Sequence, residues 1–392
     1  MFYKIKNSDA KCWLMPMRDV RMGLALYQPS GWKGRLLKQL FPYVHWSKLV
    51  RKVLNIELVE YVLQDELKEV ICRAFGVEEF RYSVFEGTPS VHQKTTIQVW
   101  NGETILGYVK LTESEEVARL FEREEKFLST VNSQQSTVNS QLSGIIFSPT
   151  EEKSRRDDIT QTGVRTPGWG ITSNINPVGV TDLVPKAVVF RLESGATILI
   201  QSTRKTLRSE VVHEWGDLQQ RFVDELYENT VQEIRWEESD VAQSLSALRE
   251  HIDWLPEGVD RDVVLKKIDD VVEKMRGQSV KYGAYHADFT PWNMFVEGGE
   301  LFVFDWEYAG RKYPKGLDRY HFWMQTALFE KHWGVEELKR YMCSDDGKWI
   351  DREMLEMYLL DIMSKYVMRE GGKVKKLGLF GVWCEMMDII VP

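Results

Sequence analysis

The sequence contains few cysteines, and they are not arranged to bind a metal or to form a disulfide framework. The four cysteines, Cys12, Cys72, Cys343 and Cys384, are scattered along 392 residues without a Cys-x-x-Cys pair. Zinc sites and small disulfide-rich domains need cysteines at close, regular spacing. The pattern therefore argues against both classes and indicates free thiols in a reducing compartment.

The chain also lacks long hydrophobic runs and an excess of positive charge. No stretch approaches the roughly 18 uncharged apolar residues of a membrane span, and the first residues lack the apolar segment of a signal peptide. Lys and Arg total 51 against 59 for Asp and Glu, a net charge of −8. This balance argues against general binding of nucleic acids. We therefore expect a cytoplasmic protein without a nucleic-acid partner and without an integral membrane segment.

What the sequence does have is the composition of a globular protein of two to three domains, with 43% hydrophobic and 28% charged residues. We expect residues 1–79 to form a helical N-terminal extension, in which Pro42 breaks one apolar pattern and Gly76 ends a helix over 56–75. Within this extension, residues 31–54 contain six Lys or Arg and no acid. We favour an extension that packs on the rest of the protein. A peripheral contact of this basic stretch with an anionic membrane is the alternative.

From residue 80 the apolar pattern changes to the period of two that is typical of β-strands. The predicted strands span residues 80–85, 94–100, 104–111, 186–192 and 196–202, and a helix over 113–128 follows the third of them. After residue 203 the helical period dominates. The pattern predicts an α+β, two-lobed fold, with a small antiparallel β lobe over 80–203 and a larger, mainly helical lobe over 204–392.

A tandem copy interrupts the predicted β lobe. STVNSQQ at 129–135 is followed at once by STVNSQL at 136–142, and a polar segment comes after them. Two copies are too few for a solenoid. We interpret residues 129–178 as a largely disordered surface insertion, with a partner-binding segment as the less favoured alternative.

The segment YHADFTPWNMFVEGGELFVFDWEYAG at 285–310 combines an apolar hairpin with polar residues at its ends. Residues 294–296 and 301–304 can pair as antiparallel strands, so that Asn293 and Asp305 meet where the strands end. A carboxamide and a carboxylate that lie on paired strand ends suit Mg²⁺, which takes one or two protein oxygens together with phosphates and water. The pattern predicts a magnesium site with Asn293 and Asp305 as its ligands.

Asp288 stands in the loop that enters this hairpin, five residues before Asn293. A carboxylate at this place can accept the proton of an attacking hydroxyl, and His286 can brace the loop through a hydrogen bond. A single aspartate in a loop more often serves in a turn or a cap. The assignment of Asp288 therefore depends on the joint pattern with Asn293 and Asp305.

The motifs HADFTPWN at 286–293 and FDWE at 304–307 resemble those of the aminoglycoside phosphotransferase / choline kinase superfamily. These are protein-kinase-like enzymes that phosphorylate small molecules, and their usual motif has a glycine where this chain has Ala287. The resemblance covers about residues 80–325, and the insertion departs from it. It implies a protein-kinase-like two-lobed fold with ATP and Mg²⁺ as cofactors.

Carried over residue by residue, the resemblance implies that Asp288 is the catalytic base and that Asn293 and Asp305 hold Mg²⁺. Asp318, in PKGLDRYHF at 314–322, matches a later family aspartate that stabilises the catalytic region. His286 is assigned a structural role.

The small lobe offers a second, independent part of the kinase pattern. Kinases need a lysine on the third strand to hold the α- and β-phosphates, paired with a glutamate on the next helix. The third predicted strand ends in Lys110, and the next helix offers Glu124, with Glu122 and Glu125 as alternatives in register. We predict that Lys110 and Glu124 form this pair.

The remaining nucleotide contacts are less well marked. EGTPS at 86–90 has one glycine and a proline, so it is not a kinase glycine loop. The resemblance implies that adenine binds the backbone after the fifth strand, at Gln201, Ser202 and Thr203.

Two function classes stay open. The first is an ATP- and Mg²⁺-dependent phosphotransferase whose acceptor is a hydroxyl of a sugar, an amino alcohol or an aminoglycoside-like molecule. The second is a non-catalytic, pseudokinase-like nucleotide-binding protein. We interpret the acids that follow the core as a solvated helix face, with an acceptor pocket for a polycation as the alternative; they are Asp345, Asp346, Asp351, Glu353 and Glu356.

Overall fold

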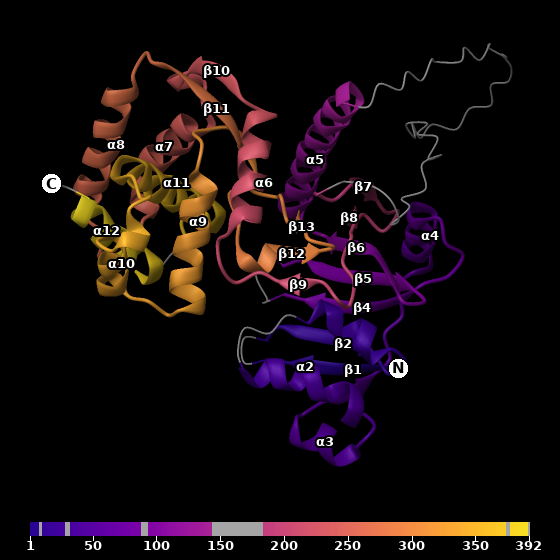
Figure 1. Cartoon of the computed structure of the whole chain (residues 1–392). Helices are drawn as coiled ribbons and strands as arrows, with labels where there is room; N and C mark the ends of the chain where they lie inside the picture. The colour runs from indigo at the N-terminus through magenta and orange to yellow at the C-terminus, as the bar shows by residue number, and fades with distance from the viewer. Residues whose placement is uncertain (8–9, 28–31, 88–92, 143–182, 374–376, 391–392) are drawn as a thin grey trace, which may run out of the picture.

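The computed structural model describes residues 1–392 apart from 8–9, 28–31, 88–92, 143–182, 374–376 and 391–392. The chain forms a β-sheet lobe with its first half and a mainly helical lobe with its second half (Figure 1). The predicted α+β, two-lobed fold is confirmed. In the described part of the chain, no helix has the length and apolar character that crossing a membrane requires.

The β lobe is built on one eight-stranded antiparallel sheet in the order β3-β1-β2-β4-β5-β6-β8-β7. Its strands are β1 Phe2–Lys6, β2 Cys12–Pro16, β3 Glu57–Val59, β4 Arg81–Glu86, β5 Thr95–Asn101, β6 Thr104–Thr112, β7 Ala187–Arg191 and β8 Thr197–Ser202. β4 to β8 agree with the five predicted strands to within one residue at each end. The fifth strand, β8, pairs with β6 and therefore lies inside the sheet.

The prediction of a helical N-terminal extension is wrong in part, because β1, β2 and β3 enlarge the expected five-stranded sheet. β2 pairs with β4, from Cys12 opposite Glu86 to Leu14 opposite Val84. Four of the five residues of β2 are buried. A strand that is covered on both faces reads as a continuous apolar run without the alternation that marks a half-exposed strand, so its sequence gave no strand signal.

The helices of the extension are α1 Val20–Gly23, α2 Trp32–Val44, α3 Lys48–Val53 and α4 Asp65–Phe75. α2 continues through Pro42, which was expected to break the pattern. α4 ends at Gly76 as predicted, because this glycine adopts the left-handed conformation that closes a helix. The predicted start of this helix at residue 56 is wrong, since residues 57–59 pair with β1.

The helix after β6, the third predicted strand, is longer than predicted. α5 spans Glu115–Leu142 and includes both copies of the tandem repeat. The prediction that disorder begins at residue 129 is therefore wrong for 129–142. Neither glycine nor proline occurs between 115 and 142, so nothing in the sequence stops the helix there. The rest of the predicted insertion, up to residue 178, lies outside the described residues.

The second half of the chain forms a helical lobe around one large apolar core, in which Leu245, Tyr358 and Trp383 are fully buried. Its helices are α6 Asp217–Glu228, α7 Asp240–Glu250, α8 Arg261–Met275, α9 Leu317–Gln325, α10 Val335–Met342, α11 Arg352–Glu370 and α12 Gly378–Ile390. The same half of the chain also forms two small three-stranded sheets.

One of these sheets carries the predicted hairpin. Its strands are β9 Glu210–Val211, β12 Met294–Glu297 and β13 Glu300–Val303, in the order β13-β12-β9. β12 and β13 lie beside the end of the large sheet (Figure 1). The other sheet contains β10 Gln232–Arg235, β11 Ser279–Tyr285 and β14 Gly310–Tyr313. The loop from β11 to β12 contains Asp288.

Candidate active site

The ends of the β12–β13 hairpin bring Asn293 and Asp305 together along the backbone. Met294 lies opposite Val303, and the Phe304 N–H donates to the Asn293 carbonyl oxygen at 3.0 Å. Asn293 is therefore opposite Phe304, and Asp305 is the next residue of the chain. The two predicted metal ligands lie at the same end of the hairpin, as the antiparallel pattern predicted.

Asp288 lies directly against Asn293. Asn293 Nδ2 donates to Asp288 Oδ2 at 2.7 Å and to the Asp288 carbonyl oxygen at 3.0 Å. The Asp288 side chain is 30% exposed, so a substrate can reach its carboxylate. The structure thus brings the predicted base to one of the predicted metal ligands.

His286 is buried beneath this loop and braces it on two sides. The Asp288 N–H donates to His286 Nδ1 at 3.2 Å, and His286 Nε2 lies 3.1 Å from the Phe304 carbonyl oxygen. Because Nδ1 accepts a hydrogen bond, the proton of the neutral ring is on Nε2, which donates to Phe304. Burial lowers the pKa of His286 to about 4, despite the opposing effect of Asp288. A neutral imidazole therefore holds the loop against the end of β13.

Asp318 holds the backbone of the same loop from α9. Its two carboxylate oxygens accept from the N–H groups of His286 at 3.1 Å and Ala287 at 3.2 Å. Ala287 has a φ of 68°, a left-handed conformation that strains a residue with a Cβ. Glycine, which has no Cβ, would adopt this conformation without strain. Burial raises the pKa of Asp318 to about 7, although both N–H groups favour its charged form.

Lys110, two residues before the end of β6, forms the predicted pair with Glu124 of α5. Its Nζ lies 2.8 Å from Glu124 Oε2 and 2.6 Å from Asp305 Oδ1. The Glu124 side chain is fully buried, while the alternative Glu125 accepts from the Val189 N–H on the outer strand β7. Of the candidate glutamates, Glu124 is thus the one that contacts Lys110. The binding of phosphates by Lys110 stays a prediction.

The second oxygen of Glu124 ties the helix to both lobes. Glu124 Oε1 accepts from Gln201 Nε2 at 2.9 Å and from the Trp306 N–H at 2.8 Å. The Gln201 side chain thus supports the ion pair, a role that the sequence did not reveal. The Ser202 N–H donates to the Lys186 carbonyl oxygen at 2.9 Å and is not free for adenine. Of the three predicted adenine contacts, Thr203 is the one that follows the end of β8.

Lys94 and Glu307 also belong to this cluster, and the sequence reasoning missed both as functional residues. Lys94 Nζ lies 2.5 Å from Glu307 Oε2 and 3.5 Å from Asp305 Oδ1. Burial opposes the ionisation of Asp305, but the ammonium groups of Lys110 and Lys94 outweigh it and hold the pKa of this carboxyl group below its usual value. Glu307 is part of the FDWE motif at 304–307, which could have marked it as a site residue. Lys94 is the first residue of a predicted strand and carries no such signal.

The same cluster contains oxygen atoms at metal-binding separation. Carboxylate oxygens of Glu124, Asp305 and Glu307 lie within 4.8 Å of one another. Oxygen donors are the ligands that Mg²⁺ prefers. The residues at the hairpin end therefore fit a magnesium ion, with the two lysines as the cations that now neutralise them.

His321 is a further residue that the sequence reasoning passed over. Its Nε2 lies 3.2 Å from Asp288 Oδ1, and its Nδ1 lies 3.3 Å from the Tyr358 hydroxyl. His321 follows Asp318 by one helical turn in α9, so both side chains face the Asp288 loop. The signal was present in PKGLDRYHF, because i and i+3 lie on one helix face.

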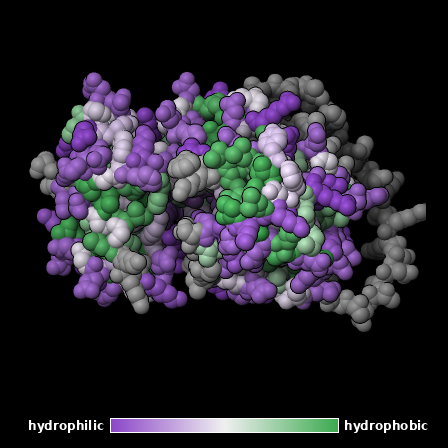
Figure 2. All heavy atoms as spheres, turned by 90° about the horizontal axis from the view of Figure 1, so that it is seen from below, coloured by the Kyte–Doolittle hydropathy of each residue, from purple (hydrophilic) through white to green (hydrophobic). Residues whose placement is uncertain are grey.

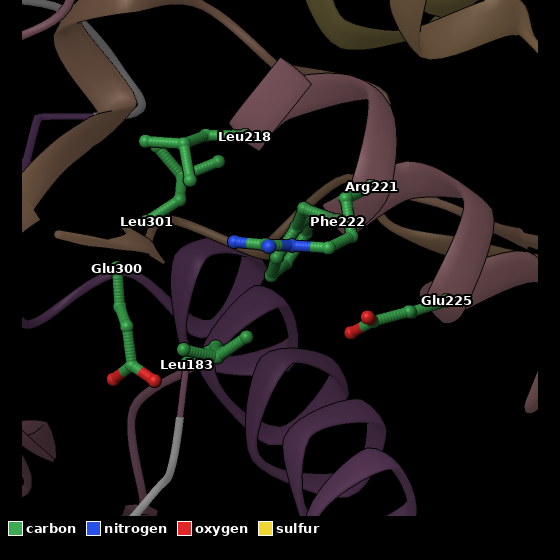
Figure 3. Close-up of a pocket in the computed structure, with 7 residues that line it drawn as sticks. All are labelled: Leu183, Leu218, Arg221, Phe222, Glu225, Glu300 and Leu301. Carbon is green, nitrogen blue, oxygen red and sulfur yellow. The ribbon is translucent and has the colours of Figure 1, made fainter.

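Two other features are separate from this cluster. Of the acids after the core, Glu353 pairs with Lys274, Glu356 pairs with Lys267, and Asp351 caps α11. The favoured interpretation as a solvated helix face agrees with the exposure of Asp345, Asp346, Asp351 and Glu353, but it is wrong for Glu356, whose side chain is 15% exposed. A pocket between α6 and β13 is lined by apolar side chains with Arg221 and the carboxylates of Glu225 and Glu300 (Figure 3). It contains none of the predicted site residues.

Of the comparisons with known proteins, the one with solved structures found proteins similar to this chain. No family model matches the chain, and no curated protein matches it. The chain is similar in structure to the amicoumacin kinase hAmiN in complex with AMP-PNP, Ca²⁺ and Ami, at 15% identity over 83% of this chain and 93% of that one, with a TM-score of 0.40.

Two other solved structures are similar to this chain to a comparable degree. They are a putative fructosamine-3-kinase from Haemophilus somnus 129PT (12% identity, 83% and 97% of the two chains, TM-score 0.42) and the choline kinase LicA from Streptococcus pneumoniae (12%, 83% and 97%, TM-score 0.39). At such identities and scores, these likenesses concern the arrangement of the chain and assign no activity to this protein.

Proposed function

We propose that this protein is an ATP- and Mg²⁺-dependent phosphotransferase that moves the γ-phosphoryl group of ATP to a hydroxyl of a small molecule. One observation carries the proposal. The partly exposed Asp288 contacts Asn293 at the hairpin end that also places Asp305 2.6 Å from Lys110. A proton acceptor, metal ligands and a phosphate-binding lysine in one place are the parts that phosphoryl transfer requires.

In this proposal each group of the chain has a distinct task. Asp288 orients the acceptor hydroxyl and takes its proton while the new oxygen–phosphorus bond forms and the bond to the β-phosphate oxygen breaks, which releases ADP. Lys110, held by Glu124, binds the α- and β-phosphates. The protein supplies position and charge, because phosphoryl transfer needs little covalent chemistry from the enzyme.

Asn293 and Asp305 are the residues that would hold Mg²⁺, and Glu307 offers a further carboxylate oxygen within reach. When bound, the ion neutralises the charge of the phosphates. Thr203 and the residues after it would face the adenine, since the Ser202 N–H is already bonded.

An exposed aromatic pair, one member of which is close to Asp288 in the sequence, suits the acceptor. Trp292, four residues after Asp288, is 37% exposed, and its ring meets that of Phe329 edge to face at 6.3 Å between centroids. Exposed aromatic faces bind the apolar face of a sugar or an amino-alcohol cation. The acceptor class in this proposal is therefore a sugar, an amino alcohol or an aminoglycoside-like molecule.

The test compares Asp288→Asn with the wild type and with Asp270→Asn, which changes an exposed aspartate of α8. ATP and Mg²⁺ should raise the unfolding temperature of all three proteins equally. Phosphate transfer, measured over a panel of sugars, amino alcohols and aminoglycosides, should be lost in Asp288→Asn alone. Turnover retained in this variant contradicts the role of Asp288, and a wild type that does not respond to nucleotide contradicts the whole proposal.

The second candidate, a non-catalytic nucleotide-binding protein, has one observation in its favour. The Lys94 ammonium contacts both Asp305 and Glu307, so a cation of the chain occupies carboxylates that a metal would need. If this is the function, nucleotide should stabilise the protein to the same degree with and without Mg²⁺, and no acceptor should be phosphorylated.

A further inference from the structure

The surface of α2 and α3 is unusually apolar. Of the eighteen large hydrophobic residues that are exposed in the described part of the chain, seven lie between residues 36 and 54. They are Leu36, Leu40, Tyr43, Trp46, Leu49, Val53 and Leu54, and we call them the α2–α3 surface. Figure 2, which views the molecule from below, shows an apolar area over these helices. Trp46, Leu49 and Val53 are each more than 70% exposed, at 72%, 71% and 76%.

On α2, this exposure is not the result of a loosely attached helix. The opposite side of α2 packs on β1 and β2, where Phe41 is fully buried and its ring meets that of Tyr3 at 5.3 Å. Leu37 packs against the same cluster, and Ser47 caps α3 by accepting from the Val50 N–H. The α2–α3 surface therefore begins on the second apolar side of a packed helix, α2, and continues over α3, in which no residue is buried.

The charged residues of the segment that forms this surface are all of one sign. No acidic residue occurs from position 20 to position 56. Arg35, Lys48 and Lys52 are exposed on the two helices. At the edge of the surface, the Arg21 guanidinium lies over the Tyr43 ring at 5.4 Å. A partner for this surface must offer apolar contact and negative charge together.

We propose that the α2–α3 surface binds peripherally to an anionic lipid bilayer. A bilayer offers acyl chains to Leu49 and Val53, an interfacial zone to Trp46 and Tyr43, and negative headgroups to the lysines, whose long stems let the ammonium groups remain in water. A second copy of the chain is disfavoured, because a two-fold contact of this surface with itself would place cations opposite cations. The proposal does not depend on the phosphotransferase activity.

The test measures co-sedimentation of the full-length protein with vesicles. It should bind vesicles of phosphatidylcholine with about 30% phosphatidylglycerol, and it should bind phosphatidylcholine alone about tenfold more weakly. Raising the salt from about 50 to about 500 mM should weaken binding several-fold, because ions screen surface charges. Absence of binding to the anionic vesicles at low salt, or equal binding to neutral ones, would overturn the proposal.

Two matched double variants distinguish vesicle binding through the α2–α3 surface from nonspecific binding through other exposed apolar residues. Trp46→Ser with Leu49→Ser removes two apolar residues of the surface, and Val62→Ser with Leu207→Ser removes two exposed apolar residues elsewhere (74% and 51% exposed). The first should reduce vesicle binding about tenfold, and the second should leave it unchanged, with both unfolding temperatures near that of the wild type. Equal loss in both variants contradicts the proposal, as does a concentration-dependent dimer that only the first variant abolishes.

Discussion

His321 Nε2 lies 3.2 Å from Asp288 Oδ1, while Asn293 holds the other oxygen of the same carboxylate at 2.7 Å. The carboxylate of the proposed base is therefore held from both sides. Tyr358 in turn contacts His321 Nδ1 at 3.3 Å. His321 and Tyr358 therefore hold in place the carboxylate that, under the proposed function, receives the proton of the acceptor hydroxyl.

A first prediction concerns this positioning. His321→Ala should lower kcat about tenfold or more and leave the KM for ATP unchanged, because the side chain touches the base and none of the proposed phosphate ligands. Tyr358→Phe removes only the hydroxyl and should have a smaller effect. His251→Ala, a change at the end of α7, is the matched control. A kcat equal to that of the wild type in His321→Ala speaks against the positioning role.

A second prediction concerns the buried pair of Lys110 and Glu124. Lys110→Met leaves the fully buried Glu124 without its cation, so the free energy of unfolding should fall by about 3 kcal/mol. Adding Glu124→Gln should restore part of this loss, because the uncompensated charge is removed. Urea unfolding of both single variants and the double variant measures the coupling. Simple additivity of the two single effects contradicts the pair.

The affinity for ATP shows whether Lys110 binds phosphate in addition to stabilising the fold through its pair with Glu124. Both Lys110→Met and the double variant should bind ATP at least tenfold more weakly, because each lacks the phosphate-binding ammonium group. The double variant regains stability without regaining affinity if Lys110 has the proposed role.

A third prediction concerns Lys94 and the metal. Lys94→Gln removes the ammonium group that contacts Glu307 at 2.5 Å and Asp305 at 3.5 Å. Mg²⁺ without nucleotide should then raise the unfolding temperature of the variant more than that of the wild type, because the carboxylates have lost a competing cation. Lys281→Gln, a change on β11, serves as the control. An equal response to Mg²⁺ in Lys94→Gln and wild type would falsify the placement of the ion at these carboxylates.

A fourth prediction concerns stability and pH through His286. Its pKa in the folded protein is lowered to about 4 by burial, while an unfolded histidine titrates near 6.5. The unfolded state therefore binds more protons between these values, and stability is lost as the pH falls through this window. From pH ~7.5 to pH ~5 the contribution of this one group is a loss of about 2 kcal/mol.

The measurement is the free energy of unfolding in urea at both pH values, for the wild type and for His286→Gln. The variant is expected to be less stable at neutral pH, because it loses the bonds to Asp288 and Phe304. It should also lose about 2 kcal/mol less than the wild type on acidification. The same slope in both proteins excludes His286 as the source.

Much of the candidate site could be predicted because its parts are local in sequence. Antiparallel pairing across a short turn places Asn293 beside Phe304, and Asp305 follows. The predicted order of strands placed Lys110 before the helix of Glu124, and Glu124 is the candidate glutamate that pairs with it. The functional roles of these residues stay predictions until transfer is measured.

Lys94 and His321, which the sequence did not mark as site residues, contact partners that are distant in the sequence. Lys94 reaches Asp305 across 211 positions, and His321 reaches Asp288 across 33. No periodicity marks a side chain whose partner lies on another element. The strand β2 was missed for a related reason, since burial on both faces removes the alternation by which a strand is recognised.

The sequence by itself determined the two-lobed α+β architecture, the five strands β4 to β8 and the hairpin that carries Asn293 and Asp305, because hydrophobic period and turn residues act over short distances. Only the tertiary structure decided that the extension enlarges the sheet, that Lys94 and His321 join the site, and that the basic segment 31–54 packs one side and exposes another apolar side. These features depend on which elements meet in space, and packing settles that choice.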